Sequence, residues 1–165
     1  MRQAVFSSLA ARVADVTFWD LFAGSGAYGL EAFSRGAAGG VFVEKDARTA
    51  GFIRQNIEAV CKSLGRPATD LRVVMGDATT LVPGPAPDLV FVDPPYALIP
   101  VIAPLLFTRL TGLLESRADP LIVFEMPGEM ELAPAGWTAV KRLGHGARQP
   151  TVVIFRANQA LPSPR

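Results

Sequence analysis

The chain has 165 residues, half of them hydrophobic, with 16 basic and 15 acidic side chains and a formal net charge of +1. This net positive charge is small for a protein that binds nucleic acid, because the affinity of such proteins usually depends on contacts with phosphates. No run approaches the roughly 20 uncharged apolar residues of a membrane span, and the first residues lack the apolar core of a signal peptide, so we expect a cytoplasmic protein.

The chain contains one cysteine, Cys61, and one histidine, His145. A single cysteine excludes an internal disulfide and a cysteine cluster for zinc. Cys61 falls in a predicted helix, and we interpret it as a packing residue. His145 lies in a Gly-His-Gly turn and is the sole candidate base for a serine or cysteine nucleophile, which disfavours hydrolase chemistry.

The chain opens in an amphipathic helix, and strand and helix patterns alternate after it. Asp46 is expected to cap the long third helix, and Pro104 to occupy the first turn of the helix after the fourth strand. The last two strands are joined by a short turn and predict an antiparallel hairpin. The expected strands are 16–22, 40–43, 71–75, 89–92, 121–124, 137–143 and 151–155, and the expected helices are 5–13, 27–35, 46–64 and 101–114.

This order of elements predicts an α/β fold: a mostly parallel seven-stranded sheet with an antiparallel C-terminal hairpin and helices on both faces. We expect one domain over residues 1–157 and a flexible tail at 158–165. The first and fourth strands are expected to be neighbours at the switch point of the sheet, where open α/β sheets bind ligands.

Four residues, Asp93, Pro94, Pro95 and Tyr96, follow the apolar run 89–92 directly. Such a run is typical of a buried parallel strand, so this tetrad is expected at the carboxyl edge of the sheet. The prolines hold the neighbouring carbonyls as rigid acceptors, and Tyr96 adds a flat face. The tetrad suits a planar base with an exocyclic amino group, although a plain proline turn after a strand explains it about equally well.

A glycine-rich segment, 24–29, follows the first strand and opens a helix. Together with Glu44, about twenty residues further on, it also fits the dinucleotide fingerprint of a nicotinamide-dependent oxidoreductase. Asp20 distinguishes the two interpretations, because a carboxylate beside a helix N-terminus disfavours a pyrophosphate and favours a cationic ligand such as S-adenosylmethionine. Gly24 and Gly26 would let the backbone approach that ligand, and Glu44 would accept its ribose hydroxyls.

The third strand ends in Asp77 and Ala78. The Asp77 carboxylate is suited to accept from an adenine amino group, and Ala78 to offer its backbone N–H. As a motif this pair is weak. Asp77 as the cap of a short helix is an equally good interpretation.

These elements together resemble the class I Rossmann-like methyltransferases, and more closely the bacterial family that methylates the N2 amine of a guanine in small-subunit (16S) rRNA. The matching segments are the opening helix 2–6, the stretch 20–32, residues 34–37 and 43–46, Asn56, and the tetrad 93–96. The resemblance implies a Rossmann-like methyltransferase fold, S-adenosylmethionine as cofactor with S-adenosylhomocysteine as product, and rRNA or the small ribosomal subunit as substrate. It implies no metal, and it is compatible with a monomer.

The resemblance also implies roles for individual residues. By accepting the two protons of the amine, Asp93 and the Pro94 carbonyl would turn the nitrogen lone pair toward the methyl group. The implied catalytic residues are Asp93, Pro94, Pro95 and Tyr96, and the implied cofactor contacts are Asp20, Phe22, Ala23, Gly24, Ser25, Gly26, Glu44, Lys45, Asp77 and Ala78.

The family usually begins with a basic segment, thought to touch RNA, ahead of the helix with which this sequence starts. We therefore expect the RNA contacts to come from a segment missing upstream of this sequence or from another subunit. Basic residues near the two ends form a candidate patch, and acidic residues cluster late in the chain, although a solvated mixed surface explains both equally well. The basic residues are Arg2, Arg12, Arg142, His145 and Arg148, and the acidic ones are Glu125, Glu129 and Glu131.

Other functions fit part of this pattern. The tetrad also serves enzymes that methylate adenine N6 or cytosine N4, so Asp93 by itself does not separate guanine from adenine. A related form with asparagine serves glutamine methylation in proteins, and Asp93 argues against that substrate. A nicotinamide-dependent oxidoreductase and a catalytically idle RNA-binding module are alternatives from other classes; neither uses the tetrad together with Asp20.

Overall fold

The computed structural model describes residues 1–159, so residues 160–165 of the expected tail lie outside the described part. Within it the chain forms seven strands at the places predicted from the sequence. They are β1 (Thr17–Leu21), β2 (Gly39–Glu44), β3 (Leu71–Met75), β4 (Leu89–Val92), β5 (Leu121–Pro127), β6 (Trp137–Leu143) and β7 (Pro150–Ala157).

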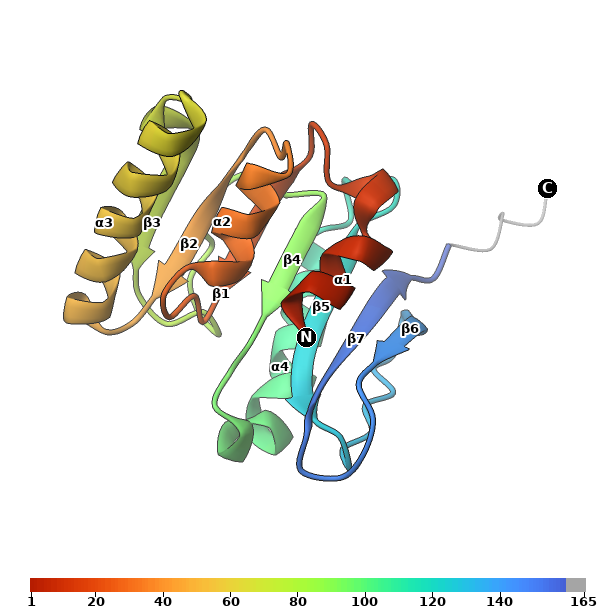
Figure 1. Ribbon diagram of the computed structural model, residues 1–165. Coiled ribbons are helices and arrows are strands. Elements are labelled where there is room, and N and C mark those ends of the chain that lie inside the picture. The colour runs from red at the N-terminus through yellow and green to blue at the C-terminus, as the bar shows by residue number, and fades with distance from the viewer. Residues whose placement is uncertain (160–165) are drawn as a thin grey trace.

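The strands form one mixed sheet in the order β3-β2-β1-β4-β5-β7-β6 (Figure 1). β1 to β5 pair in parallel, whereas β7 pairs antiparallel with both β5 and β6. β1 and β4 are neighbours, as expected for the strands at the switch point. The predicted fold, a mostly parallel sheet closed by an antiparallel hairpin, is confirmed.

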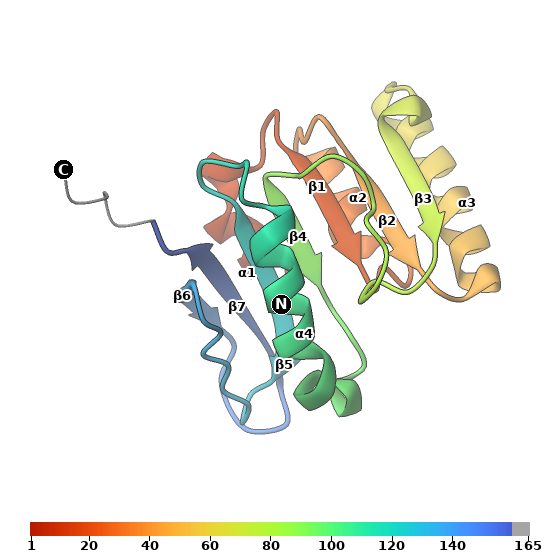
Figure 2. The ribbon, with the colours of Figure 1, turned by 180° about the vertical axis from the view of Figure 1, so that it is seen from behind.

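Helices cover both faces of this sheet. α1, α2 and α3 lie on the face turned toward the viewer in Figure 1, and α4 lies on the opposite face, seen in Figure 2. The α-helices of the described residues are α1 (Arg2–Ser8), α2 (Ala27–Ser34), α3 (Ala47–Leu64) and α4 (Ile99–Leu113), and the short 3-10 turns are η1 (Ala10–Arg12), η2 (Ala68–Asp70) and η3 (Tyr96–Leu98).

Each helical layer closes its own hydrophobic core on the sheet. Under α1 and α2, the ring of Phe91 packs against those of Phe6 and Phe18, with centroids 5.7 and 6.2 Å apart. Under α4, the rings of Phe107 and Phe124 stack with centroids 5.7 Å apart. Because helices cover both faces, β4 is buried at every residue, which is why its sequence is a continuous apolar run.

Helix ends agree with the sequence at α3 and differ at α4. The Asp46 side chain accepts the Thr49 N–H at 2.7 Å and caps α3, as predicted. α4 begins at Ile99 with Pro100 in its first turn, so Pro104 lies inside the helix and the prediction for it was wrong. Pro100 already fills the position that favours proline, and Pro104 has no N–H to donate along the helix.

The short helix that Asp77 was expected to cap is a turn instead. Asp77 Oδ1 accepts the Thr79 N–H at 2.8 Å and the Thr79 hydroxyl at 2.6 Å. The proline-rich stretch 83–87 follows closely and leaves too little chain for a helix. The turn holds the Asp77 carboxylate at the carboxyl end of β3.

Contrary to the expectation from the sequence, one segment, Tyr96–Leu113, has a mean hydropathy of 1.5 and is long and apolar enough, by composition alone, to cross a membrane. In the structure it is η3 followed by α4, and one side of the helix packs into the second core. A core helix of a globular protein passes the same compositional test.

Candidate active site

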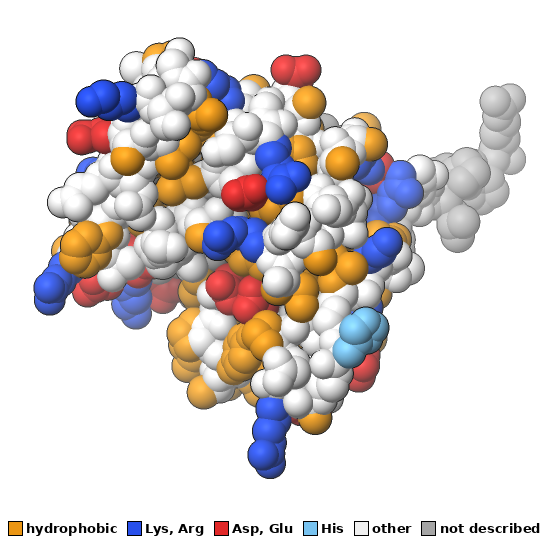
Figure 3. Space-filling model, viewed as in Figure 1, with side chains coloured by type: hydrophobic (Ala, Val, Ile, Leu, Met, Phe, Trp, Pro, Cys, Tyr) orange, Lys and Arg blue, Asp and Glu red, His pale blue; other side chains and the backbone are white. Residues whose placement is uncertain are grey.

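Two adjoining cavities open at the carboxyl edge of the sheet, where the chain leaves β1 and β4. The larger has a volume of about 630 Å³ and the smaller about 440 Å³, sizes typical of small-molecule sites. Phe22, Gly24, Asp93 and Glu125 line both cavities. Acidic side chains gather at the centre of the face shown in Figure 3, with basic and hydrophobic side chains around them.

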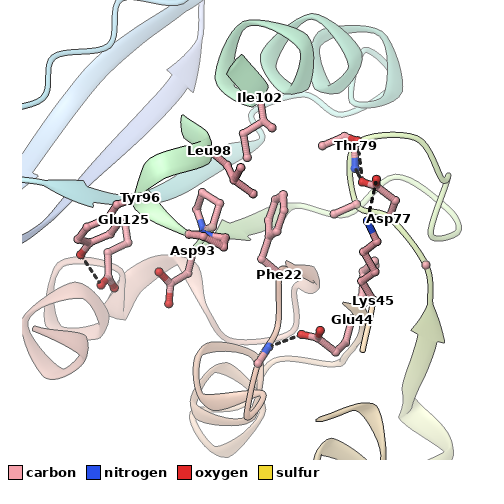
Figure 4. A pocket seen from close by; sticks show the side chains of 16 residues that line it. Phe22, Glu44, Lys45, Asp77, Thr79, Asp93, Tyr96, Leu98, Ile102 and Glu125 are labelled. Atoms are coloured by element: carbon pink, nitrogen blue, oxygen red, sulfur yellow. Dashed lines mark hydrogen bonds and ion pairs between the residues drawn. The ribbon is translucent and has the colours of Figure 1, made fainter. Parts of the chain in front are cut away.

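Four residues from four neighbouring strands form a row along this edge. The register aligns one residue in each of these strands: Val43 in β2, Leu21 in β1, Val92 in β4 and Phe124 in β5. The residues that follow them in the sequence are Glu44, Phe22, Asp93 and Glu125. Parallel strands advance in step, so the four residues lie side by side. We call them the edge row, and Figure 4 shows Asp93 between Phe22 on one side and Glu125 on the other.

Glu44 ties the glycine-rich turn to the end of β2. Its Oε2 accepts the Gly24 N–H at 2.9 Å (Figure 4), and its Oε1 accepts the Asp46 N–H at 3.0 Å. An ionised carboxylate has about four acceptor sites. Each oxygen of Glu44 therefore keeps one free site, and the side chain faces the larger cavity.

The three glycines of the fingerprint have different structural roles. Gly24 has a φ of +56°, borders both cavities, and a Cβ added there would meet no protein atom within 4 Å. A Cβ on Gly26 would lie 3.2 Å from the Phe42 ring, and one on Gly29 would press into the rings of Phe42 and Phe18. Only the first glycine leaves room for a ligand, whereas the other two let α2 approach the sheet.

Asp20 is buried beneath this turn, with 1% of its surface exposed, yet it lines the smaller cavity. Its Oδ2 accepts the Gly29 N–H at 2.9 Å. Burial, assisted by the charges of Asp93 and Glu44, raises the pKa of Asp20 to about 8 although the Gly29 N–H opposes the shift. The raised pKa brings the titration of this carboxyl group toward neutral pH, where a cation in the smaller cavity would favour its ionised form.

The Asp93–Tyr96 tetrad lies at the larger cavity, between β4 and η3, as the sequence predicted. Burial, followed by the charge of Glu125, raises the pKa of Asp93 to about 6. The Tyr96 hydroxyl donates to Glu125 Oε1 at 3.2 Å, which orients the ring beside the cavity. With the exception of Gly26, every residue predicted to act in catalysis or to bind cofactor lines one of the two cavities.

Sequence reasoning missed two residues of the site, Glu125 and Tyr28. Glu125 was grouped with Glu129 and Glu131 as a surface acidic cluster, but it lines both cavities. Its Oε2 accepts the Tyr28 hydroxyl at 2.7 Å. The signal in the sequence was its position directly after the buried run of β5, which matches the position of Asp93 after β4.

Two of the five basic residues named as a candidate patch, Arg12 and Arg142, form ion pairs with acidic side chains. Arg12 pairs with Asp119 at 3.0 Å, and Arg142 pairs with Glu131 at 3.6 Å. Of the five basic residues proposed for the patch, Arg2 alone lines either cavity in the described part of the chain.

Comparisons with known proteins agree with this geometry. A family model described as Conserved hypothetical protein 95 matches residues 1–154. The protein named ribosomal RNA small subunit methyltransferase D from Escherichia coli K12 is 31% identical over 140 residues, which cover 84% of this chain and 68% of that protein. The chain belongs to the ribosomal RNA small subunit methyltransferase D family. The resemblance predicted from the motifs is therefore confirmed.

Solved structures support the same fold for this methyltransferase D family chain. A structure from Escherichia coli is 28% identical, with a TM-score of 0.78 and coverage of 94% of this chain and 84% of that one. An RNA methyltransferase from Salinibacter ruber, solved with S-adenosyl-L-homocysteine, is 17% identical with a TM-score of 0.70, covers 99% of this chain and 94% of its own, and shares the fold. Among residues 1–159 of this family member, no cluster of three His, Cys, Asp or Glu side chains is placed to hold a metal ion.

Proposed function

We propose that this chain transfers a methyl group from S-adenosylmethionine to the exocyclic N2 amine of a guanine in small-subunit (16S) rRNA. The observation that carries the proposal is the edge row, which places the carboxylate suited to a ribose, Glu44, and the one suited to an amine, Asp93, on either side of Phe22. The name of the Escherichia coli relative supports the rRNA substrate. Residues 1–157 act as one catalytic domain, in the cytoplasm where ribosomal subunits assemble.

The larger cavity fits the nucleoside part of the cofactor. The free acceptor sites of Glu44 suit two ribose hydroxyls. At the far wall the pKa of Asp77 is lowered by its bonds to Thr79, so Asp77 is ionised, and its Oδ2 lies 3.9 Å from Lys45 Nζ at the cavity wall. Leu98 adds an apolar surface for the adenine ring. S-adenosylmethionine supplies an activated methyl group on a sulfonium, and Asp20 in the smaller cavity suits its positive end.

The carboxylates at this site disfavour the nicotinamide-dependent oxidoreductase. A pyrophosphate would meet a wall of acidic groups, with Lys45 and Arg2 as the cationic side chains that line the cavities. Like charges at such short range are repulsive, and a helix N-terminus does not offset several of them. The acidic residues that line the two cavities are Asp20, Glu44, Asp77, Asp93 and Glu125.

Asp93 and the Pro94 carbonyl orient the amine for attack. By accepting its two N–H groups they turn the N2 lone pair toward the methyl group, and orientation of this kind lowers a barrier by ~7 to 11 kcal/mol in the best cases. The N2–methyl bond forms as the methyl–sulfur bond breaks, its electron pair stays on sulfur, and the surplus amine proton passes to the Asp93 carboxylate. Stacking on Tyr96 returns roughly 1 to 3 kcal/mol of the cost of unstacking the base.

The raised pKa of Asp93 predicts an acid limb in the pH profile. Once protonated, Asp93 is a weaker acceptor and can no longer take up the amine proton, and its pKa is about 6. We expect kcat/KM for methyl transfer to fall about tenfold per pH unit below that value and to level off above it. Because the charge of Glu125 contributes to the shift, Glu125→Gln should move the limb to lower pH; an unmoved limb would assign it to another group.

Gly24 and Gly29 provide a matched pair of substitutions. Gly24→Ala places a methyl group beside both cavities at a positive φ, and Gly29→Ala presses one into Phe18 and Phe42. Each should lower the free energy of unfolding by about 1 to 3 kcal/mol. Only Gly24→Ala should also abolish S-adenosylhomocysteine binding by calorimetry, while folded Gly29→Ala protein should bind normally. If both variants bound S-adenosylhomocysteine equally well, Gly24 would not be part of the cofactor site.

The proposed function is tested by methyl transfer from labelled cofactor to small ribosomal subunits purified from cells that lack this gene. Nucleoside analysis should recover N2-methylguanosine. Recovery of N6-methyladenosine or N4-methylcytidine would instead assign the tetrad to another base. Tight binding of NAD without binding of S-adenosylhomocysteine would overturn the choice of cofactor.

A further inference from the structure

The proposed function leaves one donor of the target base without a partner. The edge of guanine that carries the N2 amine presents three N–H groups, two on N2 and one on ring atom N1. Asp93 and the Pro94 carbonyl accept the two amine protons. Once the base is enclosed, the N1–H needs an acceptor as well, since an unpaired buried donor weakens binding.

Glu125 lies where that acceptor is needed. It occupies the position beside Asp93 on the neighbouring strand, because Val92 of β4 is the register partner of Phe124 in β5. Both carboxylates line both cavities. The side chain of Glu125 is thus one strand spacing from the group that holds the amine, and N1 is the ring atom next to the carbon that bears the amine.

Two tyrosines, one in α2 and one in η3, hold the Glu125 carboxylate in place by hydrogen bonds. The Tyr28 hydroxyl on α2 donates to Oε2 at 2.7 Å, and the Tyr96 hydroxyl in η3 donates to Oε1 at 3.2 Å. The Tyr28 ring is itself stacked on Phe91 with centroids 5.4 Å apart. Of about four acceptor sites on the carboxylate, two are occupied and two remain free. The free sites belong to a group that is already held in place.

If Glu125 only accepted hydrogen bonds from the two tyrosines, it would not need a negative charge. Glu125 and Asp93 repel one another in a partly buried site, and this repulsion contributes to the raised pKa of Asp93. A glutamine would accept from tyrosine hydroxyls without that cost. Two adjacent carboxylates are matched by a ligand edge that presents adjacent donors, and guanine presents such an edge.

We propose that Glu125 selects guanine by accepting its N1–H while Asp93 holds the N2 amine. This inference rests on the proposed function and deepens it. Adenine and cytosine carry a lone pair, not an N–H, on the ring nitrogen beside their amine. That lone pair would face the Glu125 carboxylate and be repelled. Glu125 thereby supplies the discrimination that the Asp93–Tyr96 tetrad lacks.

The test replaces the target guanine with 2-aminopurine, which keeps the N2 amine but has a lone pair on N1. Small subunits are reconstituted from 16S rRNA ligated around a synthetic segment that carries either base at the position mapped as methylated. The unsubstituted protein should methylate guanine roughly 5- to 150-fold faster than 2-aminopurine. Glu125→Gln, whose amide can donate to N1, should lower the guanine rate and bring that ratio close to one or below it.

Tyr28→Phe is the matched control, since it removes one bond to Glu125 and keeps the carboxylate. It should retain the preference for guanine even if its rate falls. S-adenosylhomocysteine affinity and melting temperature verify that each variant is folded. If Glu125→Gln slows both bases equally, or if Tyr28→Phe changes the ratio as much, Glu125 only braces the site and the inference is wrong. Failure of the unsubstituted protein to methylate guanine would instead refute the proposed function.

Discussion

Asp93→Ala is expected to reduce methyl transfer by about 100- to 10 000-fold while S-adenosylhomocysteine still binds. Asp93 is the carboxylate of the edge row nearest to the amine in the proposed mechanism, and its loss leaves the Pro94 carbonyl as the remaining acceptor. In the proposed function the cofactor is held mainly by the turn after β1 and by Glu44, which hydrogen-bond to one another and are not altered by this substitution. Single-turnover transfer of labelled methyl and calorimetric titration measure the two effects separately.

Two further variants sharpen this result. Asp93→Asn keeps one acceptor oxygen and loses the charge, so its rate should lie between those of alanine and aspartate. Asp88→Ala, at the amino end of β4, removes bonds to Thr17 and Arg117 and should cost stability without slowing the folded enzyme. Retained turnover by Asp93→Ala, or an equal loss in Asp88→Ala, would refute the assigned role of Asp93.

Glu44→Ala is expected to weaken cofactor binding by about 100-fold or more, because two charge-assisted hydrogen bonds to ribose are each worth about 1.5 to 3 kcal/mol. The substitution also leaves the Gly24 N–H without its partner and loosens the turn. Calorimetric titration with S-adenosylhomocysteine measures the change. At saturating cofactor, the rate of transfer should recover, since the proposed mechanism gives Glu44 no contact with the amine or the methyl group.

The control for Glu44 is Asp46→Ala, which perturbs the same loop without lining a cavity. It removes the cap of α3 and should cost about 1 kcal/mol of stability with little change in affinity. An affinity that survives Glu44→Ala would place the nucleoside elsewhere. A loss shared equally by Asp46→Ala would assign the effect to loop distortion.

Most of the fold could be predicted because it follows from local patterns. β3, β4 and β6 have the predicted bounds, since turn-forming residues flank each of them on both sides. Pro104 was misplaced because the helix was predicted to begin at residue 101, whereas α4 begins at Ile99 and has Pro100 in its first turn. The alternative that Asp77 caps a short helix was wrong because a capping aspartate and an aspartate in a turn form the same local bonds.

Some features of the candidate site could also be predicted from the sequence, and others required the folded structure. The tetrad and the glycine-rich turn each lie on one continuous segment, so their order in the chain was enough to find them. Sequence reasoning assigned Gly24 and Gly26 the same expected role, but in the folded protein Gly24 borders both cavities whereas Gly26 lies against the Phe42 ring. The protonation of Asp20 also depends on burial, which no local pattern specifies.

The sequence by itself determined the parallel sheet, the closing hairpin, the switch point and the segments that carry the motifs, because alternation and turn chemistry act over a few residues. Tertiary structure decided which side chains meet. The register of β4 on β5 brings Glu125 beside Asp93, although they are far apart in the chain, and two tyrosine hydroxyls hold it there. Register depends on how whole strands pack between two helical layers, so the side chain proposed to recognise guanine emerges only in the folded protein.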